Sequence, residues 1–178
     1  QINGIEKGDL VWTTPITFVA TSNTAILFGA KIDFVDISPE TLNICPTLLE
    51  KKLKKAELHS RLPDFLTVVH FGGSPCDMKK IYDLSIKYGF KIIEDASHAL
   101  GASYKDKMVG ENHFSFASVF SFHPVKMITT GEGGAILLNS EKDQEKARSL
   151  RSHGIDSTKS LEINKKAGWY YEQDDLGY

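Results

Sequence analysis

The sequence has 178 residues, a length that favours one domain with a sizeable core. Its 41% apolar and 25% charged residues are ordinary for a soluble globular protein. The 21 Lys and Arg residues nearly balance the 23 Asp and Glu residues, and the formal net charge is -2. This balance gives no electrostatic footprint for nucleic acid or an anionic membrane. No apolar run approaches the roughly 18 residues that span a bilayer.

Apolar runs alternate with helical patterns, which predicts an α/β layout with largely parallel strands. In chain order the expected elements are strand 9–13, helix 17–28, strand 31–36, helix 47–56, strand 65–71, helix 77–88, strands 90–96, 118–123 and 135–138, and helix 140–153. The first helix has few charges, so we expect it to be buried on most sides. Gly89 is expected to close the third helix, and Ser140 to cap the fourth with Gly154 behind it. Without a repeat or linker, we count one domain.

The cysteines, the histidines and the chain ends indicate the redox compartment, the absence of a metal site and the completeness of the chain. Cys45 and Cys76 stand in no CxxC or metal-ligand spacing, so we expect free thiols in a reducing cytoplasm, with one disulfide as the open alternative. The six histidines form no HxH or HExxH pattern, and we expect no metal site. The start at Gln1 has neither an initiator Met nor a signal-peptide pattern, and Tyr178 follows no terminal helix. We therefore expect a fragment of a longer protein.

Lys126 is the first residue that suggests chemistry. It is the only Asp, Glu, Lys or Arg between Asn112 and Gly131, and it closely follows a predicted buried strand. Burying an ammonium group is costly, and a lysine amine held in such a place can act as a Schiff-base nucleophile. The local pattern alone slightly favours the alternative, a loop lysine that points to solvent.

Asp95 and Ser121 are the next candidates. Asp95 lies near the carboxyl end of a predicted strand, where open α/β sheets bind ligands, and it must point away from the face that Glu94 occupies. Capping of the following turn is its open alternative. Ser121 stands five residues before Lys126 and is either a phosphate-binding hydroxyl or a small core residue bonded to backbone. The run 131–134 (GEGG) has no dinucleotide or P-loop spacing and predicts a tight turn.

Taken together, several segments resemble the DegT/DnrJ/EryC1/StrS sugar aminotransferase family, a branch of the fold-type I pyridoxal phosphate enzymes. The matching segments are 12–21 (WTTPITFVAT), 69–73 (VHFGG), 93–102 (IEDASHALGA), 120–126 (FSFHPVK) and 130–134 (TGEGG). The resemblance covers essentially the whole chain. It implies a three-layer α/β/α fold with a mostly parallel mixed sheet, as in the aspartate aminotransferase-like large domain. Within the family the nearest likeness is to the transaminases of pseudaminic acid synthesis.

The resemblance also implies a role for each site residue. Lys126 stands where the family has its Schiff-base lysine, which also shuttles a proton between cofactor and substrate. Asp95 stands at the acid that pairs with the pyridine nitrogen of pyridoxal 5'-phosphate. His98 takes the position beside the phenolic oxygen of the cofactor, where many members have Gln. Phe18 matches the aromatic residue that stacks on the pyridine ring, and Ser121 matches a phosphate-binding hydroxyl.

The implied activity is a ping-pong transfer of an amino group from L-glutamate to a 4-keto sugar nucleotide, in a full-length homodimer. By this likeness, residues 1–178 form part of the cofactor-binding large domain, and the family's N-terminal phosphate loop and C-terminal small domain are absent. We therefore expect the isolated chain to bind cofactor weakly and to turn over poorly. One alternative is a pyridoxal phosphate-dependent sugar dehydratase, a branch in which His replaces the lysine found here at Lys126. The other is a non-catalytic or regulatory protein with the same fold.

Overall fold

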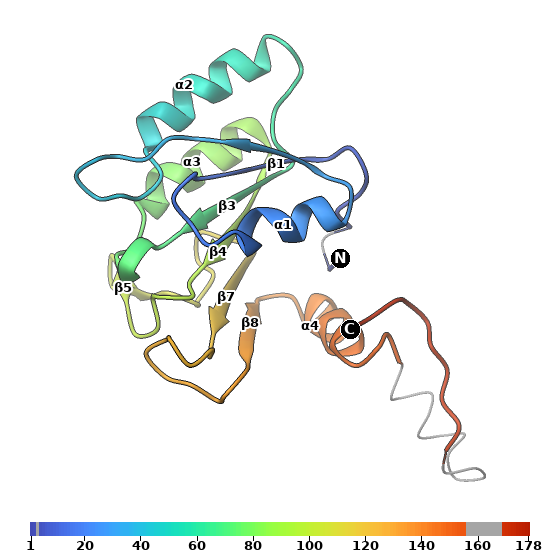
Figure 1. Ribbon diagram of the computed structural model, residues 1–178. Helices are drawn as coiled ribbons and strands as arrows, with labels where there is room; N and C mark the ends of the chain where they lie inside the picture. The colour runs from blue at the N-terminus through green and yellow to red at the C-terminus, as the bar shows by residue number, and fades with distance from the viewer. Residues whose placement is uncertain (3, 156–168) are drawn as a thin grey trace. The chain divides into compact units, whose positions relative to one another are not determined.

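The computed structural model describes residues 1–2, 4–155 and 169–178 (Figure 1). The chain forms two compact units, one of residues Ile5–Leu138 and the other of Gln1–Gly4 with Asn139–Tyr178. The first unit holds every predicted site residue. None of the helices in the described residues has the length and apolar character needed to cross a membrane.

A six-stranded sheet organises the first unit, with the strand order β2-β1-β3-β4-β7-β8. All neighbouring strands are parallel except β7 and β8, which are antiparallel, so the sheet is mixed but mostly parallel as predicted. The strands are β1 (Leu10–Thr13), β2 (Lys31–Phe34), β3 (Phe65–Val69), β4 (Lys91–Asp95), β7 (Ala117–Ser121) and β8 (Gly134–Leu138). A separate small hairpin of β5 (Ser103–Tyr104) and β6 (Lys107–Met108) was not predicted.

Helices cover both faces of this sheet. They are α1 (Ala20–Leu27), α2 (Pro46–Glu57) and α3 (Met78–Tyr88), and a single 3-10 turn follows β3 at Phe71–Gly73. On β3, Leu66 packs in a core cluster with Leu53 of α2 and Ile81 of α3, whereas its neighbour Phe65 packs in a second cluster with Ala25 of α1. Because successive strand residues point to opposite faces, α1 covers one face, and α2 and α3 cover the other (Figure 1). The predicted three-layer α/β/α arrangement is confirmed.

The expectation that the first helix is buried on most sides is wrong. Only Ala25 of α1 is fully buried, and Leu27 is 83% exposed. The helix has eight residues, about two turns, so it can lay only a narrow side against the sheet. Its apolar residues are spread around the helix instead of gathering on that side.

The predicted helix-end signals are confirmed. Gly89 ends α3 in the left-handed conformation, with φ of 80°. In the second unit, α4 (Glu141–Arg151) begins after Ser140, whose hydroxyl accepts a hydrogen bond from the Asp143 amide at 3.3 Å. Gly154 follows this helix with φ of 73°. The local pattern therefore determines where these two helices stop and start.

Candidate functional site

The candidate site lies where β4 and β7 end. Asp95, the last residue of β4, pairs in register with Val119 of the parallel strand β7. Ser121, the last residue of β7, lies two positions further on and so on the same face as Val119 and Asp95. His98 follows β4, and Lys126 lies in the loop between β7 and β8. Residues from two segments of the sequence, 95–98 and 121–126, thus lie at the carboxyl edge of the sheet, where open α/β sheets bind ligands.

Lys126 does not point freely into solvent. Its side chain is half-buried, and Nζ lies 2.9 Å from His98 Nε2, across 28 positions of sequence. A protonated lysine amine can donate to this ring nitrogen when the nitrogen carries no hydrogen. The backbone amide of Lys126 also donates to the His123 carbonyl at 2.9 Å, which closes a turn in the loop. The contact places the only lysine of this stretch directly beside one of the other predicted site residues.

The Asp95 carboxylate is held by two donors. Thr21 of α1 donates from Oγ1 to Oδ2 at 2.9 Å, and the Ser97 amide donates to Oδ1 at 3.1 Å. The second bond is the turn-capping role that was the open alternative for this residue, so Asp95 caps its turn and also faces α1. The side chain is half-buried, and each carboxylate oxygen keeps lone-pair capacity for a further donor.

On the opposite face of β4, Glu94 takes part in a buried hydrogen-bond network. The Cys76 amide donates to His70 Nδ1 at 3.1 Å, so the ring hydrogen sits on Nε2 and is donated to Glu94 Oε2 at 2.7 Å. The Ser115 hydroxyl donates to the other oxygen of Glu94. The prediction that Glu94 and Asp95 serve different faces is therefore confirmed.

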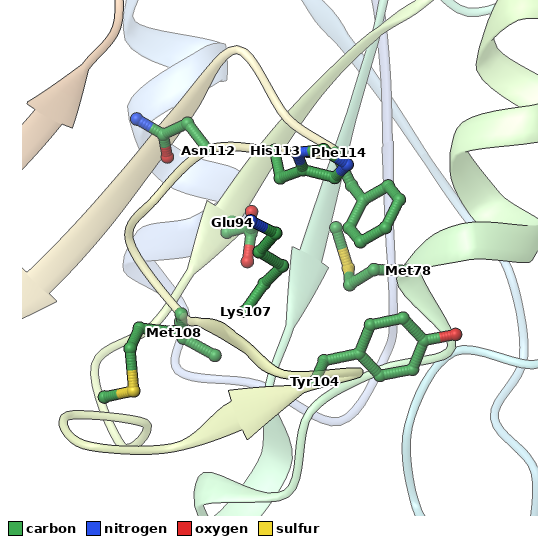
Figure 2. Close-up of a pocket in the computed structure, with 9 residues that line it drawn as sticks. Met78, Glu94, Tyr104, Lys107, Met108, Asn112, His113 and Phe114 are labelled. Carbon is green, nitrogen blue, oxygen red and sulfur yellow. The ribbon is translucent and has the colours of Figure 1, made fainter.

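A small pocket lies beside Glu94 on this second face (Figure 2). Its volume is about 20 Å³, and its lining residues are Met78, Glu94, Tyr104, Lys107, Met108, Val109, Asn112, His113 and Phe114. Such a volume fits a single water molecule, far too little for a cofactor ring. Burial, together with the nearby Glu94 charge, also raises the pKa of the Cys76 thiol to about 12. On this face the polar groups of Glu94 and Cys76 are therefore buried in the core, and the predicted site residues Asp95 and Ser121 lie on the other face.

Phe18 and Ser121 have no described contact with the other predicted site residues. Phe18 is 75% exposed and precedes α1 by two positions, so its ring is available for a contact outside the core. Ser121 Oγ accepts a long hydrogen bond of 3.4 Å from the His123 amide. This is the backbone bond that was the open alternative for Ser121, and the hydroxyl keeps its own hydrogen to donate.

In the residues that the structure describes, no three His, Cys, Asp or Glu side chains are grouped to hold a metal ion.

Three residues near the candidate site are not among those predicted from the sequence. Two of them are Thr17 and Thr21, whose hydroxyl oxygens lie 2.9 Å from each other. Their separation of four positions in the sequence is the signal that could have paired them, because residues at this spacing share one side of a helix. Gly73 has φ of 86°, and a Cβ added there would lie 2.6 Å from the His98 carbonyl oxygen. Only glycine therefore lets the turn after β3 approach the loop that carries His98.

Comparison with known proteins gives consistent matches over the whole chain. The model of the DegT/DnrJ/EryC1/StrS aminotransferase family matches residues 1–177. A "UDP-4-amino-4,6-dideoxy-N-acetyl-beta-L-altrosamine transaminase" of Campylobacter jejuni subsp. jejuni serotype O:23/36 (strain 81-176) is 44% identical over 172 residues, which cover 97% of this chain and 42% of that protein. The "Spore coat polysaccharide biosynthesis protein SpsC" of Bacillus subtilis (strain 168) is 38% identical, over 100% of this chain and 44% of that protein.

Solved structures agree with these relatives. "Helicobacter pylori PseC, aminotransferase involved in the biosynthesis of pseudoaminic acid" has a TM-score of 0.80 and 33% identity, covering 97% of this chain and 42% of that one. An aminotransferase from Psychrobacter cryohalolentis has a TM-score of 0.83 and 31% identity, covering 99% and 43%. The chain thus spans less than half the length of the relatives it matches. Over that length, it is a member of the DegT/DnrJ/EryC1/StrS aminotransferase family.

Proposed function

We propose that the protein is a pyridoxal phosphate-dependent aminotransferase that transfers an amino group from L-glutamate to a 4-keto sugar nucleotide in amino-sugar synthesis. The observation that carries the proposal is the contact of Lys126 Nζ with His98 Nε2 at the sheet edge that Asp95 and Ser121 also occupy. Family membership implies pyridoxal phosphate as the cofactor, and two curated relatives are named as transaminases of a UDP-linked amino sugar.

The residues present fit this cofactor. Lys126 is the amine that would bond to its aldehyde carbon, and Asp95 is the half-buried carboxylate that would pair with its ring nitrogen. Phe18 offers an exposed aromatic face for stacking on a flat ring. The Ser121 hydroxyl would donate to the phosphate group, and His98 would lie beside the phenolic oxygen.

Each of these side chains has a limited and distinct task. When bound, the cofactor supplies an electron-poor ring that stabilises negative charge on the substrate carbon. Asp95 would keep the ring nitrogen protonated by offering a negative charge to its N–H. The amine of Lys126 would move a proton to or from the substrate carbon. His98, with Nε2 at 2.9 Å from Lys126 Nζ, orients that amine.

We also propose a cytoplasmic homodimer, since the free thiols of Cys45 and Cys76 suit a reducing compartment and the family resemblance implies sites shared between subunits. We infer the dimer, the donor and the 4-keto group from the family alone. The nucleotide is proposed as UDP because that is the nucleotide in the printed names of two relatives.

The proposed function can be tested by following the two halves of the amino transfer separately, first from L-glutamate and then to the sugar nucleotide. The intact protein loaded with cofactor and mixed with L-glutamate alone should form about one 2-oxoglutarate per subunit, as expected for a ping-pong mechanism. Adding a UDP-linked 4-keto sugar should then yield the amino sugar, detected by mass spectrometry, and permit further turnover. The Lys126→Ala variant should form neither product, whereas Lys105→Ala, a change in the exposed turn between β5 and β6, should behave as the wild type. Stoichiometric 2-oxoglutarate from Lys126→Ala, or none from the wild type, would contradict the proposal.

A further inference from the structure

Two threonine hydroxyls connect the start of α1 to the Asp95 carboxylate. Thr21 Oγ1 lies 2.9 Å from Asp95 Oδ2 and also 2.9 Å from Thr17 Oγ1. A hydroxyl has a single hydrogen, and Thr21 gives its own to the carboxylate. The bond between the threonines must therefore run from Thr17 to Thr21. The result is a directed relay, Thr17 to Thr21 to Asp95, in which each donor polarises the next.

The same hydrogen-bond relay also includes the turn that carries Phe18. This residue lies between the two threonines in sequence, and its carbonyl accepts the Thr21 amide hydrogen at 3.1 Å. The ring of Phe18 is 75% exposed, so packing in the core does not fix its position. The turn that carries Phe18 is thus tied at Thr21 to the carboxylate at the end of β4, 74 positions away in sequence.

We propose that Thr21, supported by Thr17, is a positioning residue that aligns Asp95 and Phe18 for one planar cofactor. The proposal rests on the function proposed above. Asp95 has one donor from its own turn, the Ser97 amide, and that donor moves with it. Thr21 is the donor from a different element, α1, so it determines where the Oδ2 atom points. Its hydroxyl also stabilises the negative charge that keeps the ring nitrogen protonated.

The test compares four variants of the intact protein after removal of the cofactor. Thr21→Val removes the hydroxyl while keeping the branched shape. We expect the Kd for pyridoxal phosphate to rise at least about tenfold, the lower end of the loss for a hydrogen bond to a charged group. Thr17→Val leaves the Thr21 bond in place and should have a smaller effect. Thr21→Ser keeps the hydroxyl and should restore binding to within about twofold of the wild type. Thr24→Val is the matched control, because Thr24 lies on the same helix, is exposed and bonds only to the Ala20 carbonyl at 2.9 Å among the contacts described.

A second readout separates positioning from a purely structural effect. With cofactor labelled with ¹⁵N in the ring, the chemical shift of that nitrogen reports whether it is protonated. Thr21→Val should shift the signal toward the neutral form, whereas Thr24→Val and Thr21→Ser should not. Unfolding temperatures of the cofactor-free variants show that each is folded, and the difference between Val and Ser at position 21 isolates the hydroxyl from the packing.

The possible outcomes are distinguishable. If Thr21→Val binds cofactor like the wild type and leaves the ring nitrogen protonated, the positioning role is wrong while the proposed function stands. If Thr24→Val or Thr21→Ser weakens binding as much as Thr21→Val, the effect comes from the helix and the proposal is again wrong. If the wild type binds no pyridoxal phosphate, or binds it equally without the Lys126 amine, the proposed function fails and this proposal fails with it.

Discussion

Replacing His70 with Leu tests the buried network beneath the site. The change keeps a similar volume but removes the donor to Glu94 Oε2 and the acceptor of the Cys76 amide. Both His70 and Cys76 are fully buried, and Glu94 is 5% exposed, so bulk water does not reach these groups, and the small pocket beside Glu94 has room for a single water molecule. A lost hydrogen bond to a charged group costs about 1.5–3 kcal/mol, and a buried amide left without an acceptor costs about 1–3 kcal/mol. Since Ser115 still donates to Glu94, we expect a loss of about 3 kcal/mol, near the low end of the sum of these two costs.

Urea unfolding provides the measurement. With a slope of about 2 kcal/mol/M, a loss of about 3 kcal/mol moves the midpoint down by about 1.5 M and leaves the slope unchanged. Two controls bound the effect. His59→Leu makes the same substitution at an exposed position and should change the free energy of unfolding by at most about 0.5 kcal/mol. Glu50→Gln breaks the exposed pair with Lys54 and should also cost at most about 0.5 kcal/mol. A loss below about 1 kcal/mol for His70→Leu would show that the hydrogen bonds of His70 do not stabilise the fold to this extent.

Further predictions concern Gly73 and the two thiols. Gly73→Ala should lower the free energy of unfolding by about 1–3 kcal/mol and weaken cofactor binding, because a φ of 86° is strained for alanine and the new Cβ would meet the His98 carbonyl. Gly101→Ala is the matched control, since Gly101 has φ of 81° but open space around it. Comparing the two variants in unfolding and binding titrations separates backbone strain from displacement of His98. A thiol reagent at pH 8 should modify Cys45 and spare buried Cys76 until the protein is unfolded; rapid reaction of both native thiols would contradict this. Because the pKa of Cys76 is raised from 9.0 to about 12, the unfolded thiol ionises first as the pH rises, so stability falls by up to about 1.4 kcal/mol per pH unit between those values. The slope should be smaller in Cys76→Ala, and an equal slope would exclude this cause.

The sheet was predictable from sequence because its signals are local. The run Phe65–Val69 is apolar and β-branched, and all five residues are buried in the structure, as a central parallel strand requires. Gly89 and Ser140 mark helix ends through their own backbone and hydroxyl groups. The hairpin of β5 and β6 escaped because strands of two residues are too short to show any periodicity.

The site was predictable only in part for a different reason. Lys126 and Asp95 were indicated by their positions at predicted strand ends, whereas Phe18 and His98 came from the family resemblance alone. The bonds that connect the site cross long stretches of sequence, such as Thr21 to Asp95 across 74 positions. No periodic pattern reports such a pair, because it depends on how α1 lies against the sheet. The exposure of the apolar residues of α1 was not predicted either, because it also depends on how this helix lies against the sheet.

Chemical trapping can show whether Lys126 forms a covalent bond with pyridoxal phosphate. The intact protein is incubated with pyridoxal phosphate, reduced with borohydride so that the carbon–nitrogen bond becomes permanent, digested and mapped by mass spectrometry. We predict one stoichiometric pyridoxyl modification, on the peptide that contains Lys126, and its loss in Lys126→Ala but not in Lys55→Ala, a change at an exposed lysine of α2. Stoichiometric modification of a different lysine, or a modification that survives in Lys126→Ala, would contradict a Schiff-base role for Lys126.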